Sequence, residues 1–174
     1  LGKLTLSTGK SYEGPFENGF KSGKGVETSN TGARYEGEFL DDSFNGQGIL
    51  TLTSGYSYVG QFKDNLLHGK GVETTSNNII YKGEFKNDLK SGQGIRTWPS
   101  GSSYEGIYLN GLQHGYGTET YTDGRRYQGE FVNNSYEGFG IYEESDIRYE
   151  GQFKNGLFHG KGFWSEEGKY SYDG

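Results

Sequence analysis

The chain has 174 residues, a net charge of −6, 32 glycines and no cysteine. It lacks the basic stripe of a nucleic-acid-binding protein, has no cysteine for a disulfide, and shows neither an apolar run of transmembrane length nor a signal peptide. Only 30% of the residues are hydrophobic, which with abundant glycine is typical of disorder, but 16% are aromatic, which argues against it. We therefore expect a thin structure whose few large core residues recur at fixed positions.

A tyrosine recurs along the chain, followed two residues later by glycine and four residues later by an aromatic residue. The repeats start at residues 12, 35, 58, 81, 104, 127 and 149, a period of 23 residues that shortens once to 22. Their tyrosine–glycine pairs are Tyr12 and Gly14, Tyr35 and Gly37, Tyr58 and Gly60, Tyr81 and Gly83, Tyr104 and Gly106, Tyr127 and Gly129, and Tyr149 and Gly151. A fixed period of this length predicts a repeat array.

We interpret residues 1–174 as one array, with partial copies at 1–11 and 172–174. The last partial copy holds Tyr172 and Gly174. The chain contains no methionine and begins with leucine, so we expect it to be a fragment of a longer protein.

Each repeat predicts two strands. In the copy at Tyr81, the residues Tyr81, Gly83 and Phe85 alternate with charged residues, so the first strand has an aromatic face and a charged face. The second strand begins at a Gly-x-Gly pair and continues with residues that are mostly β-branched, such as Ile95.

Two kinds of turn join these strands. Three residues before a tyrosine stand Gly32, Gly55, Asn78, Gly101 and Gly124, and seven residues after a tyrosine stand Gly19, Asp42, Asn65, Asp88, Gly111, Asn134 and Gly156. All are residue types that tolerate a positive φ. We therefore predict an all-β fold, an elongated single-layer antiparallel β-meander of stacked hairpins. Sheet twist should curve or twist it and leave a groove.

The pattern Tyr-x-Gly-x-Phe, turn, Gly-x-Gly, strand, turn closely resembles the MORN (membrane occupation and recognition nexus) repeat. This resemblance covers nearly the whole chain and implies a curved single-layer sheet that acts as a scaffold in cytoskeletal, ciliary, junctional or cortical complexes. Tyr108 departs from the pattern by replacing the usual phenylalanine. The copy after Gly140 is one residue short, with Asp146 at its turn, and the copy after Gly162 has its turn glycine, Gly168, one place early. We expect different turn geometry in these last two hairpins.

The positions two and four residues after the second glycine of Gly-x-Gly vary most between copies. Large apolar residues occupy some of them, while other copies carry charge: Leu50, Leu52, Trp98, Tyr121, Tyr142 and Trp164. These side chains either pack on neighbouring strands or form an anchor row for a partner, since Trp and Tyr are enriched at binding hot spots. The aromatic members concentrate in the C-terminal half, where we expect a partner to bind.

Another apolar group lies eight and nine residues after the tyrosines. We assign the residues at the ninth position, Phe44, Leu67, Tyr136 and Phe158, to the inter-repeat loop. One place earlier, we expect a structural plug for that loop: Phe20, Leu66, Leu89, Leu112 and Leu157.

Catalysis and metal binding are not indicated. His68, His114 and His159 share one repeat position and lie two repeats apart, roughly 19 Å, whereas zinc ligands lie ~2 Å from the metal. We interpret them as turn-capping residues. No residue breaks the repeat to form an isolated catalytic site, and Gly-x-Gly here opens a strand instead of a helix, unlike a phosphate-binding loop. The sequence therefore predicts no catalytic residue, no metal and no cofactor.

The function that these observations favour is a non-catalytic protein–protein interaction scaffold. It would bind a helical or extended segment of a protein partner along its groove, in a cytoplasmic assembly of cytoskeletal, ciliary or cortical type. Two alternatives stay open. One is a phospholipid or membrane-surface binding module, which net acidity disfavours. The other is a homotypic unit that forms a homodimer, which is compatible with the scaffold. No nucleic-acid partner is expected.

Overall fold

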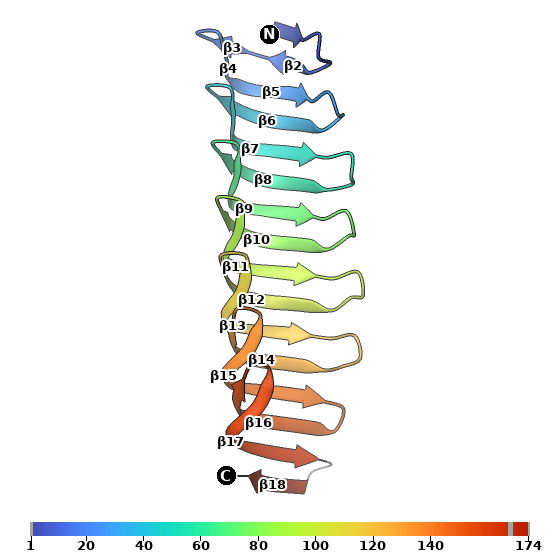
Figure 1. Ribbon diagram of the computed structural model, residues 1–174, viewed down its shortest axis with the longest axis vertical. Coiled ribbons are helices and arrows are strands. Elements are labelled where there is room, and N and C mark those ends of the chain that lie inside the picture. The colour runs from blue at the N-terminus through green and yellow to red at the C-terminus, as the bar shows by residue number, and fades with distance from the viewer. Residues whose placement is uncertain (1, 167–168, 174) are drawn as a thin grey trace. The chain divides into compact units, whose positions relative to one another are not determined.

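The computed structural model describes residues 2–166 and 169–173, and side chains up to residue 166 (Figure 1). The regular secondary structure in these residues consists entirely of β-strands, and consecutive strands form antiparallel hairpins. This confirms the predicted all-β meander. The strands are β1 (Gly2–Thr5), β2 (Ser11–Gly14), β3 (Phe16–Glu17), β4 (Phe20–Lys21), β5 (Gly23–Thr28), β6 (Arg34–Leu40), β7 (Ser43–Thr51), β8 (Ser57–Lys63), β9 (Leu66–Thr74), β10 (Ile80–Lys86), β11 (Leu89–Thr97), β12 (Ser103–Leu109), β13 (Leu112–Thr120), β14 (Arg126–Val132), β15 (Ser135–Glu144), β16 (Ile147–Lys154), β17 (Leu157–Glu166) and β18 (Lys169–Asp173).

The chain divides into two compact units, Leu1–Leu89 and Lys90–Gly174. In unit 1 the sheet order is β1-β2-β5-β6-β7-β8-β9-β10, and in unit 2 it is β11 to β18 in sequence. The first repeat alone is interrupted, because Pro15 has no N–H to donate to a ladder and separates β2 from β3. As a result β3 and β4 form a small sheet of their own.

The predicted turns are confirmed. All seven residues that follow a tyrosine by seven positions have a positive φ, between 67° and 87°. The five that precede a tyrosine by three positions have a φ between 59° and 95°. The expected change at Asp146 is also confirmed, because β15 and β16 are joined by a two-residue turn in which Ser145 has a φ of 51°. The expectations at Gly168 and Gly174 lie outside the described residues.

The register explains the Tyr-x-Gly and Gly-x-Gly signatures. Gly129 on β14 pairs with Gly117 on one side and with Gly140 on the other, so the glycines form a row across the strands. The Tyr127 ring lies over this row. A Cβ added at Gly129 would lie 2.5 Å from the Tyr127 Oη and 2.6 Å from the Gly140 Cα, closer than real Cβ contacts. Glycine is therefore required so that the ring can lie flat against the sheet.

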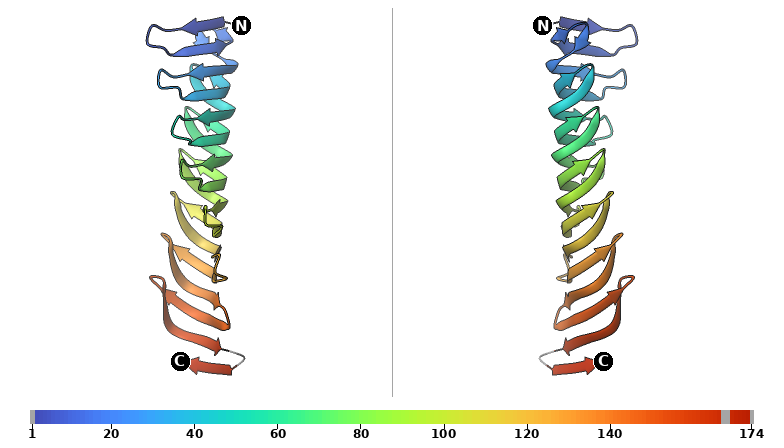
Figure 2. Two further views of the ribbon diagram at one scale, coloured as in Figure 1. Left: turned by 90° about the vertical axis from the view of Figure 1, so that its right-hand side faces the viewer. Right: turned by 90° about the vertical axis from the view of Figure 1, so that its left-hand side faces the viewer.

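Five hairpins, β6–β7, β8–β9, β12–β13, β14–β15 and β16–β17, bend where the second strand carries a bulge. Between β14 and β15 the register shifts after Gly129, and the bulged Gly138 has a φ of 62°. The amide of Phe139 donates to the Glu130 carboxylate at 3.4 Å, which closes the bulge. Beyond the bend, the end of the hairpin folds over the tyrosine rings; we call this end the hairpin tip and the covered surface the Tyr face. The curved outer parts of β14 to β17 are visible in Figure 2.

The core is a ladder of aromatic rings on the Tyr face. The seven repeat tyrosines, from Tyr12 to Tyr149, are buried, and so are six of the seven aromatic residues four places later: Phe39, Phe62, Phe85, Tyr108, Phe131 and Phe153. The exception is Phe16 of the interrupted first repeat, which is 41% exposed. Tyr127 packs edge-to-face on Phe131 of its own repeat at 5.2 Å and on Phe153 of the next at 4.9 Å. Aromatic pairs of this kind contribute about 0.5–1.5 kcal/mol beyond their burial. The Tyr127 hydroxyl donates to the Glu130 carbonyl at 2.9 Å, so the buried phenol keeps a partner.

The expected loop plug is wrong. Phe20, Leu66, Leu89, Leu112 and Leu157 are exposed, with 71% of Leu157 accessible. The tight two-residue turn places the eighth-position residue, the predicted plug, outward, and the ninth-position residue inward. The ninth-position residues were predicted to lie in a loop, but they lie on a strand. Phe44 thus pairs with Phe39 across β6 and β7, and its ring stacks on Tyr35 with centroids 3.7 Å apart.

Candidate functional site

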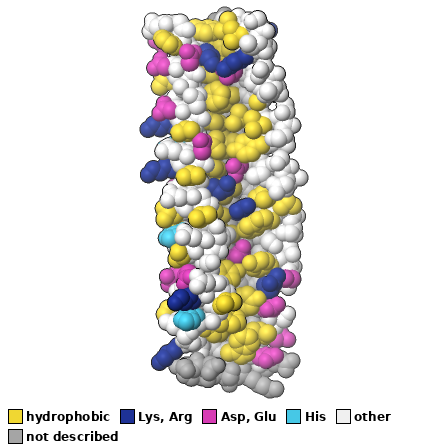
Figure 3. All heavy atoms as spheres, in the orientation of Figure 1, with side chains coloured by type: hydrophobic (Ala, Val, Ile, Leu, Met, Phe, Trp, Pro, Cys, Tyr) yellow, Lys and Arg dark blue, Asp and Glu magenta, His cyan; other side chains and the backbone are white. Residues whose placement is uncertain are grey.

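The six predicted partner-binding residues all lie on the Tyr face. Register places Leu50 opposite Tyr35 and Tyr58, and Tyr142 opposite Tyr127 and Tyr149. Trp164 pairs with Tyr149. The remaining three lie two residues after a residue that faces the same way: Leu52 after Leu50, Trp98 after Arg96, and Tyr121 after Glu119. Leu52 is 36% exposed and the other five are half-buried. Hydrophobic side chains gather along the middle of this face in the space-filling view (Figure 3).

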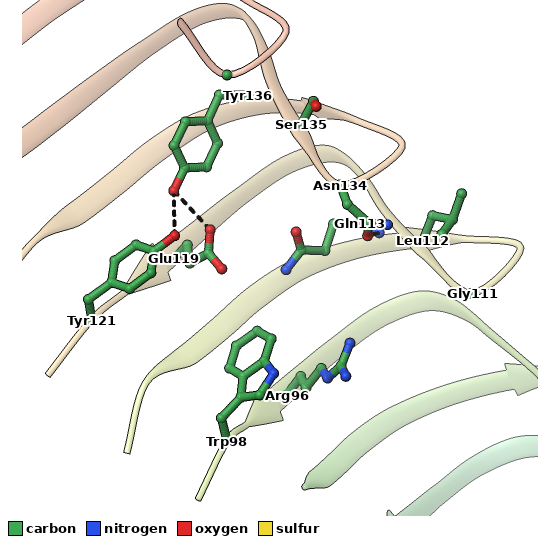
Figure 4. A pocket seen from close by; sticks show the side chains of 11 residues that line it. Arg96, Trp98, Gly111, Leu112, Gln113, Glu119, Tyr121, Asn134, Ser135 and Tyr136 are labelled. Carbon is green, nitrogen blue, oxygen red and sulfur yellow. Dashed lines mark hydrogen bonds between the residues drawn. The ribbon is translucent and has the colours of Figure 1, made fainter. Parts of the chain in front are cut away.

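Unit 2 has a hollow of about 500 Å³ on this face. Six side chains define it: Arg96, Trp98, Gln113, Glu119, Tyr121 and Tyr136. Figure 4 shows Arg96 and Trp98 at the end of β11 as one wall, and Glu119, Tyr121 and Tyr136 as the other. The structure therefore brings Trp98 and Tyr121, which are 23 residues apart, to a single site.

The first wall is a cation placed on an indole. The guanidinium carbon of Arg96 lies 4.9 Å from the centroid of the Trp98 ring. The Arg96 Nε is buried and has no hydrogen-bond partner among the described residues. This wall thus offers a flat aromatic surface together with an unused donor, which suits an anionic group.

The second wall is a hydrogen-bonded group. The hydroxyls of Tyr121 and Tyr136 lie 3.0 Å apart, and the Tyr136 hydroxyl donates to Glu119 Oε2 at 2.9 Å. Burial, reinforced by these hydrogen bonds and the Glu119 charge, raises the pKa of Tyr136 well above its usual value, and burial also raises that of Tyr121. Both phenols therefore stay protonated at neutral pH, and Glu119 is fixed in place as the acidic group of the site.

The two walls are separated by one strand. Tyr104 on β12 pairs with Arg96 on β11 and with Glu119 on β13. Since neighbouring strands lie ~4.8 Å apart, Arg96 and Glu119 rise from the sheet roughly 10 Å apart. No ion pair joins their side chains in the described structure, and Glu119 accepts its hydrogen bond from a neutral phenol, so both charges are available to a ligand.

Tyr142 and Trp164 meet at a different place in unit 2. Their rings both lie 5.8 Å from the ring of Phe158, and the Tyr142 hydroxyl donates to Glu144 at 2.9 Å. Leu50 and Leu52 lie in unit 1. The aromatic residues predicted to bind a partner thus make local contacts and also leave surface open, so both interpretations of the row fit the geometry.

Sequence reasoning missed four of the six side chains that define the hollow, and of these Gln113 was not singled out at all. Arg96 and Glu119 occupy a variable position recognised from the repeat, but only its apolar members were chosen as site residues. Tyr136 was assigned to a loop. Comparison between repeats gave the signal for Arg96, since it is the only cation that this position carries in the seven copies.

The histidines do not cap turns, so that interpretation is wrong. His68, His114 and His159 lie within β9, β13 and β17, each directly before the bulged glycine. The Nδ1 atoms of His68 and His114 are buried without a hydrogen-bond partner in the described structure. Among the described residues, no group of three or more His, Asp or Glu side chains is placed to hold a metal. Nor do those residues include a helix of the length and apolarity needed to cross a membrane.

Comparison with known proteins identifies the repeat. The family model of the MORN repeat matches residues 12–34, 35–55, 58–79, 81–103, 104–125, 127–143 and 149–165. No curated protein matches the chain in sequence.

The SAS-4 TCP domain is a solved structure of similar fold. This structure is from Drosophila melanogaster and holds the domain in complex with a proline-rich motif of Ana2. It is 8% identical, with a TM-score of 0.54 over 99% of this chain and 88% of that one. A streptogramin B lyase aligns over 97% of this chain and 76% of that one at 12% identity, but its TM-score of 0.17 shows no shared fold.

Proposed function

We propose, from the premise that this chain belongs to the MORN-repeat family, that it is a non-catalytic scaffold whose Tyr face binds a segment of a protein partner. The binding residues are Trp98, Tyr121, Tyr142 and Trp164 in unit 2, with Leu50 and Leu52 as a lesser contact in unit 1. The partner segment is extended or helical.

One observation carries this proposal: Trp98 stands at the edge of a hollow with part of its indole accessible, above a layer of rings that is already packed. The repeat tyrosines account for the fold, so Trp98 and Tyr121 are additional to it. Large aromatic side chains of this kind dominate protein interfaces when a partner covers them.

Two further points support a protein partner. The SAS-4 TCP domain, which is similar in fold, is bound to a proline-rich motif of another protein. The net charge of −6 weakens attraction to an anionic membrane, which disfavours the lipid-binding alternative. A homodimer is compatible with the scaffold. In line with the family, we place the protein in a cytoplasmic assembly of cytoskeletal, ciliary or cortical type.

The chain's two tryptophans provide the test, because both lie on the Tyr face. Candidate partners are recovered by cross-linking and mass spectrometry, and a purified partner segment is titrated while tryptophan fluorescence is followed. Trp98→Ala and Trp164→Ala, each first checked for unchanged melting, are each expected to weaken binding about thirtyfold, or ~2 kcal/mol.

Tyr116→Ala is the matched control. Tyr116 is 57% exposed and pairs with Glu130, on the face opposite the repeat tyrosines. The Tyr116→Ala variant should therefore bind the partner with the affinity of the wild type. If both tryptophan variants keep full affinity, the aromatic row serves packing alone and the proposal fails. Binding to anionic liposomes that weakens with salt would instead support the membrane alternative.

A further inference from the structure

We propose that the hollow of unit 2 selects a proline-rich, extended segment carrying an acidic side chain for Arg96 and, three residues away, a basic side chain for Glu119. This inference rests on the proposed function and specifies the chemistry of the partner. It follows from the unused charge of Arg96, from the distance between the two walls, and from the size of the hollow.

Arg96 is the arginine that the protein itself leaves unpaired. The other four arginines each lie within 4.0 Å of a carboxylate: Arg34 with Glu36, Arg125 with Asp123, Arg126 with Glu143, and Arg148 with Glu143 and Glu150. Arg96 has no such partner among the residues whose side chains are described, and its Nε is buried. A buried donor without a partner is costly, and a guanidinium can donate two parallel hydrogen bonds to a carboxylate. An aspartate or glutamate of the partner would supply that contact.

Glu119 is the complementary charge on the opposite wall. Its Oε2 accepts a hydrogen bond from the Tyr136 hydroxyl, and a carboxylate can accept several more. The intervening pairs Arg96–Tyr104 and Tyr104–Glu119 hold the backbones of the two charged residues roughly 10 Å apart at the sheet. A partner that satisfies both must therefore carry an acid and a base separated by that distance on one side of its chain.

A polyproline II segment has this spacing. It rises ~3.1 Å per residue with three residues per turn, so residues i and i+3 lie on one side, roughly 9.3 Å apart. Residues i and i+3 of a β-strand span a similar length but point to opposite sides. The flat rings of Trp98 and Tyr121 also match the aromatic-lined grooves that polyproline II ligands prefer.

A helix fits less well. It would need six or seven residues between the two charges, and as a cylinder ~10 Å wide it would occupy roughly 800 Å³ over that span. Because this exceeds the hollow of about 500 Å³, only part of a helix would lie within it. The geometry therefore favours the extended segment, for which we expect the acid and the base to be three residues apart.

The test is a selection from a randomised library of decapeptides with blocked termini. The full chain, Arg96→Gln, Glu119→Gln and the control Arg126→Gln are screened in parallel; Arg126 already pairs with Glu143. Peptides chosen by the full chain and by Arg126→Gln should share an acid and a base three positions apart, with proline near them. Arg96→Gln should lose the preference for the acid alone, and Glu119→Gln the preference for the base alone.

A selected peptide is then resynthesised with its acid replaced by the amide. The change should weaken binding to the full chain about tenfold or more, equivalent to about 1.4 kcal/mol, and should have little effect on binding to Arg96→Gln. Peptides that bind through Trp98 but lack a fixed acid, or that place the charges six or seven apart, would overturn this inference and leave the scaffold proposal standing. If no peptide binds in a Trp98-dependent way, both fail. Arg96-dependent binding to phosphatidylserine in phosphatidylcholine vesicles, without peptide binding, would assign Arg96 to a membrane instead.

Discussion

The ring of Tyr136 stacks on the ring of Tyr127, with centroids 3.7 Å apart and planes inclined by 11°. Tyr127 belongs to the sheet and Tyr136 to the hairpin tip, so the stack joins the folded tip to the sheet. Phe44 makes the same contact with Tyr35 in unit 1, at 3.7 Å and 7°. At these repeats the sheet therefore carries a second layer of rings, which supports the site above it.

Replacing Tyr136 should separate its packing from its hydrogen bonds. Full truncation of a buried aromatic costs about 3–5 kcal/mol, and since Tyr136 is half-buried we expect Tyr136→Ala to cost about 2–3 kcal/mol. Tyr136→Phe keeps the stack and loses only the bonds to Tyr121 and Glu119, so about 1 kcal/mol is expected. Chemical denaturation measures both. Equal losses for the two variants would show that the stack contributes nothing.

Substitution of the glycine beneath each tyrosine ring should destabilise the protein far more than substitution of the residue before it. In Gly106→Ala the new Cβ would lie 2.4 Å from the Tyr104 Oη and 2.7 Å from the Gly117 Cα, so the ring or the strand must move. Overpacking of this kind costs about 1–3 kcal/mol. The control is Glu105→Ala, an exposed position on the opposite face, where a change within about 0.5 kcal/mol is expected. Similar melting shifts for both variants would mean that the two faces are assigned wrongly.

Consecutive hairpin tips are joined by a side-chain hydrogen bond that depends on the turn residue. The Asn65 Oδ1 accepts from the Phe44 amide at 2.8 Å, while the Asn65 amide donates to the Phe44 carbonyl at 3.0 Å. Gly156 occupies the same place and makes only the backbone bond, to Tyr136. Asn65→Gly should therefore cost about 1 kcal/mol.

The reverse substitution, Gly156→Asn, should stabilise the protein by about 0.5–1 kcal/mol. A Cβ there meets nothing within 4 Å, and asparagine tolerates the φ of 79°. Asn65→Asp is the control, because Asp42 and Asp88 already accept the equivalent bond. Thermal melting measures all three. Destabilisation by both Asn65→Gly and Gly156→Asn would refute a role for the side-chain bond.

The repeat period was sufficient to predict the strands, the turns and the aromatic face, because each depends on local residue type. The recurrence of Gly, Asn and Asp at the turns indicates a positive φ there. The alternation of residues along the strand places Tyr81 and Phe85 on the same face of the sheet. The tips could not be predicted in the same way. The two-residue turn pairs the ninth-position residue with the buried aromatic of the first strand, as Tyr136 with Phe131, so the ninth position lies inward and Leu157, at the eighth, lies outward.

The candidate site was predicted only in part for a related reason. Trp98 and Tyr121 were recognisable as large residues at variable positions. Their meeting with Tyr136 depends on the folded tip, and the unpaired state of Arg96 depends on where every carboxylate lies. Neither can be read from one repeat, since both involve three strands and the geometry of the bend.

Raising the pH should unfold the protein through its buried phenols. Burial, as the main cause, raises the pKa of Tyr58 and of Tyr104 to about 12, against about 10 for an exposed tyrosine. The folded state holds these protons more tightly than the unfolded chain, so the stability they provide is complete below about pH 10 and is lost as the pH rises towards 12. Phenolate absorbance and circular dichroism, followed together, should therefore show late-ionising tyrosines that titrate as the strand signal disappears. Tyr104→Phe removes one such group, and its stability should fall less steeply with pH in this range. Ionisation of all tyrosines near pH 10 with the fold intact would contradict the buried ladder, since those phenols would then lie in water.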